Sequence, residues 1–201
     1  AMQELGAITE LVARAGYYAA LRFATDTADP ERGALLQHVQ ERETQIQTTL
    51  LFFELEWAAL PEQRSQELLA GPGLDFARHH LQNVRRYREH LLSEPEEKIL
   101  AEKALTGASA WTRLFDELTS AIKVELPGEQ GERELLALDV ALSRLALPER
   151  EVRRSAAEAV TTALLPGLRT RAYLFNTLLA DKATDDRLRS YPNWLAARNL
   201  A

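Results

Sequence analysis

Apolar residues recur at intervals of three and four through most of the chain, which is the spacing of one helical face. The first such series consists of Leu5, Ile8, Val12, Ala15 and Ala19. A second series, close to a heptad seam, consists of Leu35, Val39, Ile46, Leu50, Phe53 and Trp57. The pattern therefore predicts one helix that ends before residues 26–29 and a longer one over residues 30–60. The second helix would span on the order of 45 Å at 1.5 Å per residue.

Helix-breaking and helix-capping residues divide the rest of the chain into further helices. Asp29 followed by Pro30 is a typical N-cap with proline at the first helical position. A glycine-proline-glycine run at residues 71–73 ends a short helix, and an amphipathic helix is expected over residues 74–92. Residues 93–97 read SEPEE, a helix start with acids in the first turn. The helix that follows ends near residues 106–107.

The next predicted helix starts near residue 109 and has four large apolar residues that we expect to face inward: Trp111, Leu114, Phe115 and Leu118. A further helical stretch opens at Pro148. Pro166 and Gly167 lie in its middle, and a proline there removes a backbone hydrogen bond, which kinks or divides a helix.

One segment alternates as a strand does. Ile122, Val124 and Leu126 alternate with polar residues, and residues 127–131 (PGEQG) are suited to a turn. We predict a small β-hairpin near residues 121–136, followed by a short helix over residues 137–145. The fold class is therefore all-α, an elongated multi-helix bundle with this minor hairpin. Neither a linker nor an internal repeat divides the chain, so residues 1–201 are expected to form a single domain.

Composition narrows the classes of function. The 201 residues are 46% hydrophobic and 27% charged, which is ordinary for a globular protein. The net charge of −6 argues against a general nucleic-acid binder or a binder of anionic membranes. Absence of cysteine excludes disulfides and thiolate metal sites, and fits a reducing compartment. No secretory signal opens the sequence, so we expect a cytoplasmic protein.

Candidate chemistry within the chain is sparse. The HExxH zinc motif does not occur, and adjacent His79 and His80 would point about 100° apart on a helix. Catalytic pairs among the many carboxylates are less plausible than solvated helix faces. A basic cluster comprises Arg78, His79, His80, Arg85, Arg86, Arg88 and His90. It suggests either a patch for an acidic partner or, more simply, the polar face of a helix. The residues alone indicate a helical scaffold without catalytic or metal-binding residues.

Four stretches resemble the oligoendopeptidase F family, the M3-family zinc metallopeptidases related to thimet oligopeptidase. The most specific covers residues 91–124, LLSEPEEKILAEKALTGASAWTRLFDELTSAIKV. The others occur in the family's order: DTADPERGALLQHVQ (26–40), PEREVRRSAAEA (148–159) and DKATDDRLRSYPNWLAARNLA (181–201). The resemblance is to the N-terminal region of that family, before its catalytic domain.

The resemblance implies a non-catalytic N-terminal domain that forms one side of a deep channel with a catalytic domain of the same polypeptide. That channel admits short peptides, and the zinc site lies in the catalytic domain. Ala1 before Met2, and helix-forming residues at the end, also lead us to expect a piece of a longer protein. Arg189, Tyr191 and Trp194 are the candidates for the domain junction or cleft, with Trp194 starting the next helix.

An alternative is a stand-alone helical protein–protein interaction domain without enzymatic activity. An N-terminal domain separated from its catalytic domain would expose an apolar face, so we also expect some self-association of the isolated domain.

Overall fold

A computed structural model describes residues 2–128 and 132–200 and shows a mostly helical chain. In order, its elements are α1 (Met2–Thr25), α2 (Pro30–Ala59), α3 (Glu62–Ala70), α4 (Arg78–Arg86), the 3-10 helix η1 (Arg88–His90), α5 (Glu94–Ala104), α6 (Ala108–Ser120), β1 (Lys123–Pro127), β2 (Arg133–Ala137), α7 (Leu138–Ser143), the 3-10 helix η2 (Arg144–Ala146), α8 (Arg150–Leu164), α9 (Leu168–Leu188) and α10 (Ala196–Leu200).

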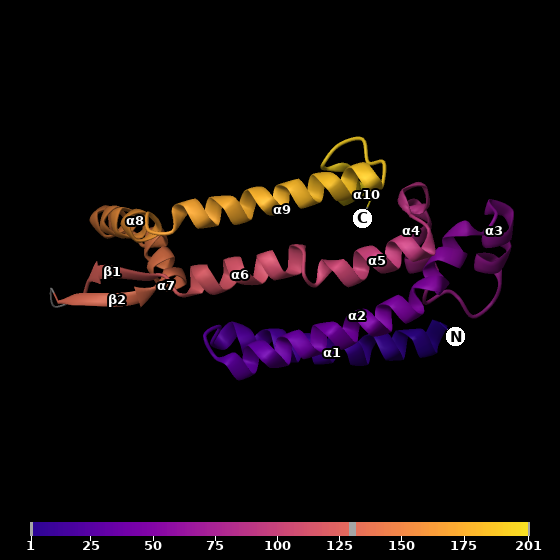
Figure 1. The fold of residues 1–201 in the computed structure, drawn as a ribbon, viewed down its shortest axis with the longest axis horizontal. Helices are drawn as coiled ribbons and strands as arrows, with labels where there is room; N and C mark the ends of the chain where they lie inside the picture. Colours follow the sequence, from indigo (N-terminus) through magenta and orange to yellow (C-terminus); the bar gives the residue numbers. More distant parts are fainter. Residues whose placement is uncertain (1, 129–131, 201) are drawn as a thin grey trace.

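The helices form three elongated layers (Figure 1). One layer is the antiparallel pair α1 and α2, the middle layer is α5 followed end to end by α6, and α9 forms the third layer. Helix α5 contacts α2, whereas α6 contacts α9. Helices α3 and α4 lie at one end of the molecule, and the hairpin with α7 and α8 lies at the other. The predicted all-α elongated bundle with a small hairpin is confirmed.

The predicted helix starts are present. The Asp29 carboxylate accepts hydrogen bonds from the Glu31 and Arg32 amides at 2.8 and 3.3 Å, which satisfies two of the free amides at the start of α2. At the start of α5, the Ser93 amide donates to the Glu96 carboxylate at 2.9 Å, as in a capping box.

Strands β1 and β2 pair antiparallel, with Lys123 opposite Ala137 and Pro127 opposite Arg133. Val124 and Leu126 point into the molecule, as their alternation predicts. The turn predicted over residues 127–131 includes residues 129–131, which lie outside the described residues.

Pro166 and Gly167 divide the predicted helix instead of kinking it. Helix α8 ends at Leu164 and α9 begins at Leu168. Gly167 has φ of 72°, a left-handed conformation that glycine adopts at little cost. The chain direction therefore changes between α8 and α9.

The helix predicted over residues 74–92 is wrong in length. Helix α4 covers only Arg78–Arg86. Before it, the Ala77 amide donates to the Leu74 carbonyl, and after it the His90 amide donates to the Tyr87 carbonyl, at 3.0 and 2.8 Å. These bonds join residues three apart, so both flanks form tight turns in place of α-helix.

Buried apolar residues form separate small clusters. One joins the hairpin to α7 and α8 and is centred on Val124. Another packs Trp57 of α2 against α3 and α4, and a third joins α1 to α2 around Phe23. Leu114, predicted to face inward, is 38% exposed, while Trp111, Phe115 and Leu118 are half-buried. The middle layer therefore has no fully buried apolar residue in α6.

Within residues 2–128 and 132–200, the structure has no helix with the length and apolar character needed to cross a membrane.

Candidate functional site

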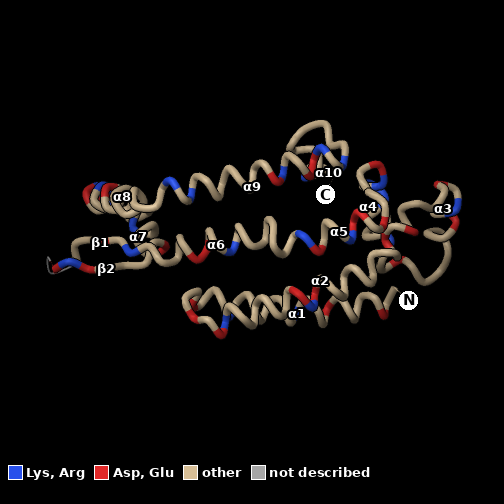
Figure 2. The backbone as a smooth tube through the Cα atoms, viewed as in Figure 1, with Lys and Arg blue, Asp and Glu red and all other residues tan. Residues whose placement is uncertain are grey.

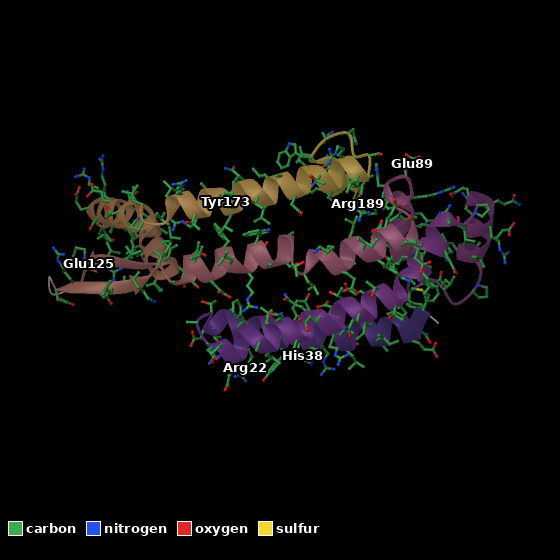
Figure 3. All side chains as sticks on the ribbon, viewed as in Figure 1. Arg22, His38, Glu89, Glu125, Tyr173 and Arg189 are labelled. Atoms are coloured by element: carbon green, nitrogen blue, oxygen red, sulfur yellow. The ribbon has the colours of Figure 1, made fainter. Side chains whose placement is uncertain are left out.

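The three residues predicted for a junction lie at and after the end of α9. Arg189 caps α9 and is half-buried, as is Tyr191, whereas Trp194 is 72% exposed. The structure brings Arg189 and Tyr191 onto the connection between α4 and α5, and Figure 3 shows Arg189 between the end of α9 and that connection. The helix predicted to start at Trp194 begins instead at Ala196, because the Leu195 amide bonds the Asn193 side chain at 3.1 Å in a turn.

Arg189 forms a two-pronged ion pair with Glu97 of α5. Its two terminal nitrogens donate to the two carboxylate oxygens of Glu97 at 2.6 and 2.8 Å, and its Nε donates to Asp185 at 3.0 Å. The side chains of Glu97 and Arg189 are 9% and 19% exposed. Planar guanidinium groups fit carboxylates in this geometry, so α5 and α9 are joined at a fixed distance and angle.

The electrostatics of this pair favour the charged forms. Burial by itself raises the pKa of Glu97, but hydrogen bonds from Arg189 and the Leu92 amide, with the Arg189 charge, outweigh it and hold that pKa below its usual range. Hydrogen bonding to Glu97 raises the pKa of Arg189, against the effect of burial. Both groups are therefore ionised at neutral pH.

His90 and Arg189 bond each other reciprocally. The His90 Nδ1 lies 2.8 Å from the Arg189 carbonyl oxygen, and the Arg189 guanidinium donates to the His90 carbonyl at 3.3 Å. Since a carbonyl oxygen only accepts, His90 carries its proton on Nδ1. The Tyr191 ring stacks on the imidazole with centroids 4.0 Å apart, and burial raises the pKa of Tyr191. We call His90, Glu97, Asp185, Arg189 and Tyr191 the junction cluster.

Backbone contacts hold the segment beyond the junction cluster. Ser190 has φ of 57°, and the Tyr191 amide donates to the Asp186 carbonyl at 2.8 Å, so the chain turns sharply after α9. The Tyr87 hydroxyl then donates to the Ala197 carbonyl at 3.4 Å. The direction in which the chain leaves α9 is thus fixed from both α4 and α9.

A groove of about 930 Å³ runs between the layers and includes part of the junction cluster. Its walls come from α1, α2, α5 and α9 and from residues around the start of α4. Apolar side chains predominate, among them Leu5, Leu50, Leu51, Phe76, Leu100 and Leu188. Glu97, Asp185 and Arg189 also line it.

Sequence reasoning missed Glu97 and placed His90 only in the basic cluster, as part of a patch or of the polar face of a helix. Glu97 is the residue after a capping-box acid, and its neighbours Glu94 and Glu96 are exposed at the same helix start. Nothing in the local pattern distinguishes the buried acid from these two. Only the arginine almost a hundred residues later explains why it is buried.

The basic cluster around α4 serves the fold in part. The Arg85 side chain donates to the Trp57 and Leu60 carbonyls at 3.0 and 2.9 Å, at the end of α2, and pairs with Glu62 at 2.8 Å. Arg78 pairs with Asp75. Figure 2 shows basic and acidic residues side by side at this end of the molecule. Arg85 therefore satisfies free carbonyls and the negative end of the α2 dipole.

The described residues contain no cluster of metal-ligating side chains. Within residues 2–128 and 132–200, no three histidine or carboxylate side chains converge as a metal site would require.

The fold and the junction cluster define a class: a layered helical domain in which the end of the last long helix, α9, is ion-paired to α5 of the middle layer. Residues 56–123 match the family model described as Oligopeptidase F, the N-terminal model of the M3 peptidases. The oligoendopeptidase F homolog of Borreliella burgdorferi is 27% identical over 114 residues, which is 57% of this chain and 19% of that protein. The resemblance of this chain to the N-terminal region of the oligoendopeptidase F family is therefore confirmed.

Solved structures share the fold over almost the whole chain. Oligoendopeptidase-F from Enterococcus faecium superposes with a TM-score of 0.79 at 24% identity, covering 98% of this chain and 39% of that one. A structure from Chlamydophila abortus has a TM-score of 0.62 at 22% identity, covering 98% and 33%. The chain therefore spans well under half the length of the proteins it matches.

Proposed function

We propose that this chain is the non-catalytic N-terminal domain of a zinc-dependent oligoendopeptidase, in which it forms one side of the cleft that admits short peptides. Residues 1–201 act as a single domain, and the zinc and the catalytic residues belong to a catalytic domain of the same polypeptide. The observation that carries this proposal is the match of residues 56–123 to the Oligopeptidase F family. Absence of cysteine supports a cytoplasmic location.

We further propose that Arg189, Tyr191 and Trp194 mark the junction to the catalytic domain. The junction cluster supports this role, because it fixes the direction of the chain after α9 by contacts from η1, α5 and α9. Trp194 is 72% exposed and so is available to pack against a following domain. A preset direction would reduce the conformational freedom lost when the two domains enclose a substrate.

The first test is to read the encoding gene on both sides of these codons. An HExxH motif within a few hundred downstream codons is expected, and its absence from a complete reading frame would refute the peptidase assignment. The whole protein should then hydrolyse a quenched oligopeptide in a chelator-sensitive way. The control is residues 1–201 alone with added zinc. Turnover by this fragment would contradict a non-catalytic role, whereas a stop codon directly after it would favour a stand-alone interaction domain.

A further inference from the structure

The groove between the layers combines apolar walls with an excess of acidic groups. Among its charged lining residues, the acids Glu54, Glu97, Asp181 and Asp185 outnumber the bases Lys103 and Arg189. Glu97, Asp185 and Arg189 are bonded to one another in the junction cluster. Within the described part of the chain, Glu54 and Asp181 have no ion pair or side-chain hydrogen bond, and both are exposed. Two carboxylates of the groove are thus available to an incoming cation.

The apolar wall offers contacts of the size of amino-acid side chains. Phe76 is 62% exposed and lines the groove with Leu50, Leu100 and Leu188. The volume of about 930 Å³ lies in the range of ligand-binding clefts. The ligand that complements such a groove has apolar side chains and a positive charge, and the protonated amino end of a peptide has both.

We propose that this groove binds the amino-terminal part of a short cationic peptide. The α-amino group and a basic first side chain pair with Glu54 and Asp181, and the following apolar side chains lie against Phe76 and Leu100. The choice of a peptide as the ligand rests on the proposed function. A second copy of the chain is the poorer occupant, because each copy carries a net charge of −6 and would bring more negative charge to an acidic groove.

The test is fluorescence anisotropy with residues 1–201 and the hexapeptide Arg-Ala-Leu-Phe-Ala-Gly, labelled at its carboxyl end. We expect saturable binding that weakens at 0.5 M salt. Glu54→Gln and Asp181→Asn should each weaken binding several-fold, and together about tenfold or more. Glu158→Gln is the matched control, because Glu158 is an exposed acid on α8 and does not line the groove.

A second arm blocks the groove without changing its charge. Ala104 is exposed and lines the groove, so Ala104→Trp should abolish binding while leaving the circular dichroism spectrum unchanged. An acetylated peptide with norleucine in place of arginine should bind at least tenfold more weakly. Equal affinity for the neutral peptide, or full affinity of the Glu54→Gln/Asp181→Asn double variant, would overturn the proposal. Dimerisation in ultracentrifugation that Ala104→Trp abolishes would also overturn it, in favour of a second copy as the occupant.

This experiment measures binding and not turnover, so a negative result for the groove can be distinguished from a negative result for the peptidase assignment. Loss of peptide binding with a peptidase-active parent protein removes only the groove assignment. Binding by residues 1–201 with an inactive parent protein keeps the groove assignment and removes the peptidase assignment.

Discussion

Replacing Arg189 by methionine is expected to lower the stability of the domain by about 3 kcal/mol. Breaking a buried ion pair by removing one partner costs about 3–5 kcal/mol, because the remaining charge is left uncompensated. The lower end applies here, since the Arg189 side chain is 19% exposed and the Leu92 amide still donates to Glu97 at 2.9 Å. For a domain of this size, that loss corresponds to a fall in Tm of roughly 6–12 °C.

The assay is urea and thermal unfolding at pH 7, followed by circular dichroism. Arg187→Met is the matched control, since Arg187 is exposed, lies on the same helix and has no ion pair within the described residues. It should change the stability by no more than about 0.5 kcal/mol. The double variant Glu97→Gln/Arg189→Met should lose less than the sum of the two single variants. A loss below about 1 kcal/mol for Arg189→Met would refute the assigned importance of the pair.

The pH dependence separates the ion pair from simple packing. The pKa of Glu97 is lowered in the folded protein, so its stabilising contribution is complete above the unfolded value of about 4.3 and disappears as the pH falls through the folded value. Without Arg189, burial dominates and raises the pKa of Glu97. Protonation of Glu97 then removes the unpaired buried charge, so the variant regains part of its lost stability as the pH falls. The difference between wild type and Arg189→Met should therefore shrink between pH 7 and pH 3. If the difference in stability between wild type and Arg189→Met does not change with pH, the loss comes from packing of the aliphatic part of Arg189 and not from the ion pair.

Further variants test the caps and turns that define the elements. Asp29→Ala should destabilise by about 1 kcal/mol through loss of the N-cap, as measured by urea unfolding, with Asp29→Asn nearly unchanged. Arg85→Ala should lower the free energy of unfolding by about 2 kcal/mol, because it leaves carbonyls at the end of α2 without donors. Arg86 is exposed, so Arg86→Ala should leave that free energy unchanged. Gly167→Ala should lower the free energy of unfolding by about 1 kcal/mol, seen as a lower Tm, because alanine adopts the positive φ of Gly167 only at a cost. Gly6→Ala in α1 should raise the Tm slightly, because alanine favours a helix more than glycine does.

Most of the fold follows from local signals in the sequence. Asp29 and Ser93 specify where α2 and α5 begin through bonds to amides within a few residues. Pro166 and Gly167 separate α8 from α9, and the alternation of Val124 and Leu126 identifies the hairpin. Each of these effects acts over a short stretch of backbone, which is why a single sequence suffices to predict them.

The candidate site was only partly predictable, because its partners are distant in the sequence. Arg189 and Tyr191 were proposed from the family resemblance, which shows where a domain ends but not what holds it. Glu97 and His90 become recognisable only when α5 and α9 are placed side by side. The early end of α4 has the same origin, since periodicity shows which face of a segment is apolar but not how many turns it forms.

Three arginines form hydrogen bonds between different elements of the bundle. Arg85 donates to carbonyls at the end of α2, and Arg113 of α6 donates to the Gly33 carbonyl of α2 at 3.3 Å. Arg189 joins α9 to Glu97 of α5. Each guanidinium offers five donors in a rigid plane, so one side chain can fix both the spacing and the angle of two elements. Arg113 and Arg189 thus bridge neighbouring layers, and the groove lies between those layers.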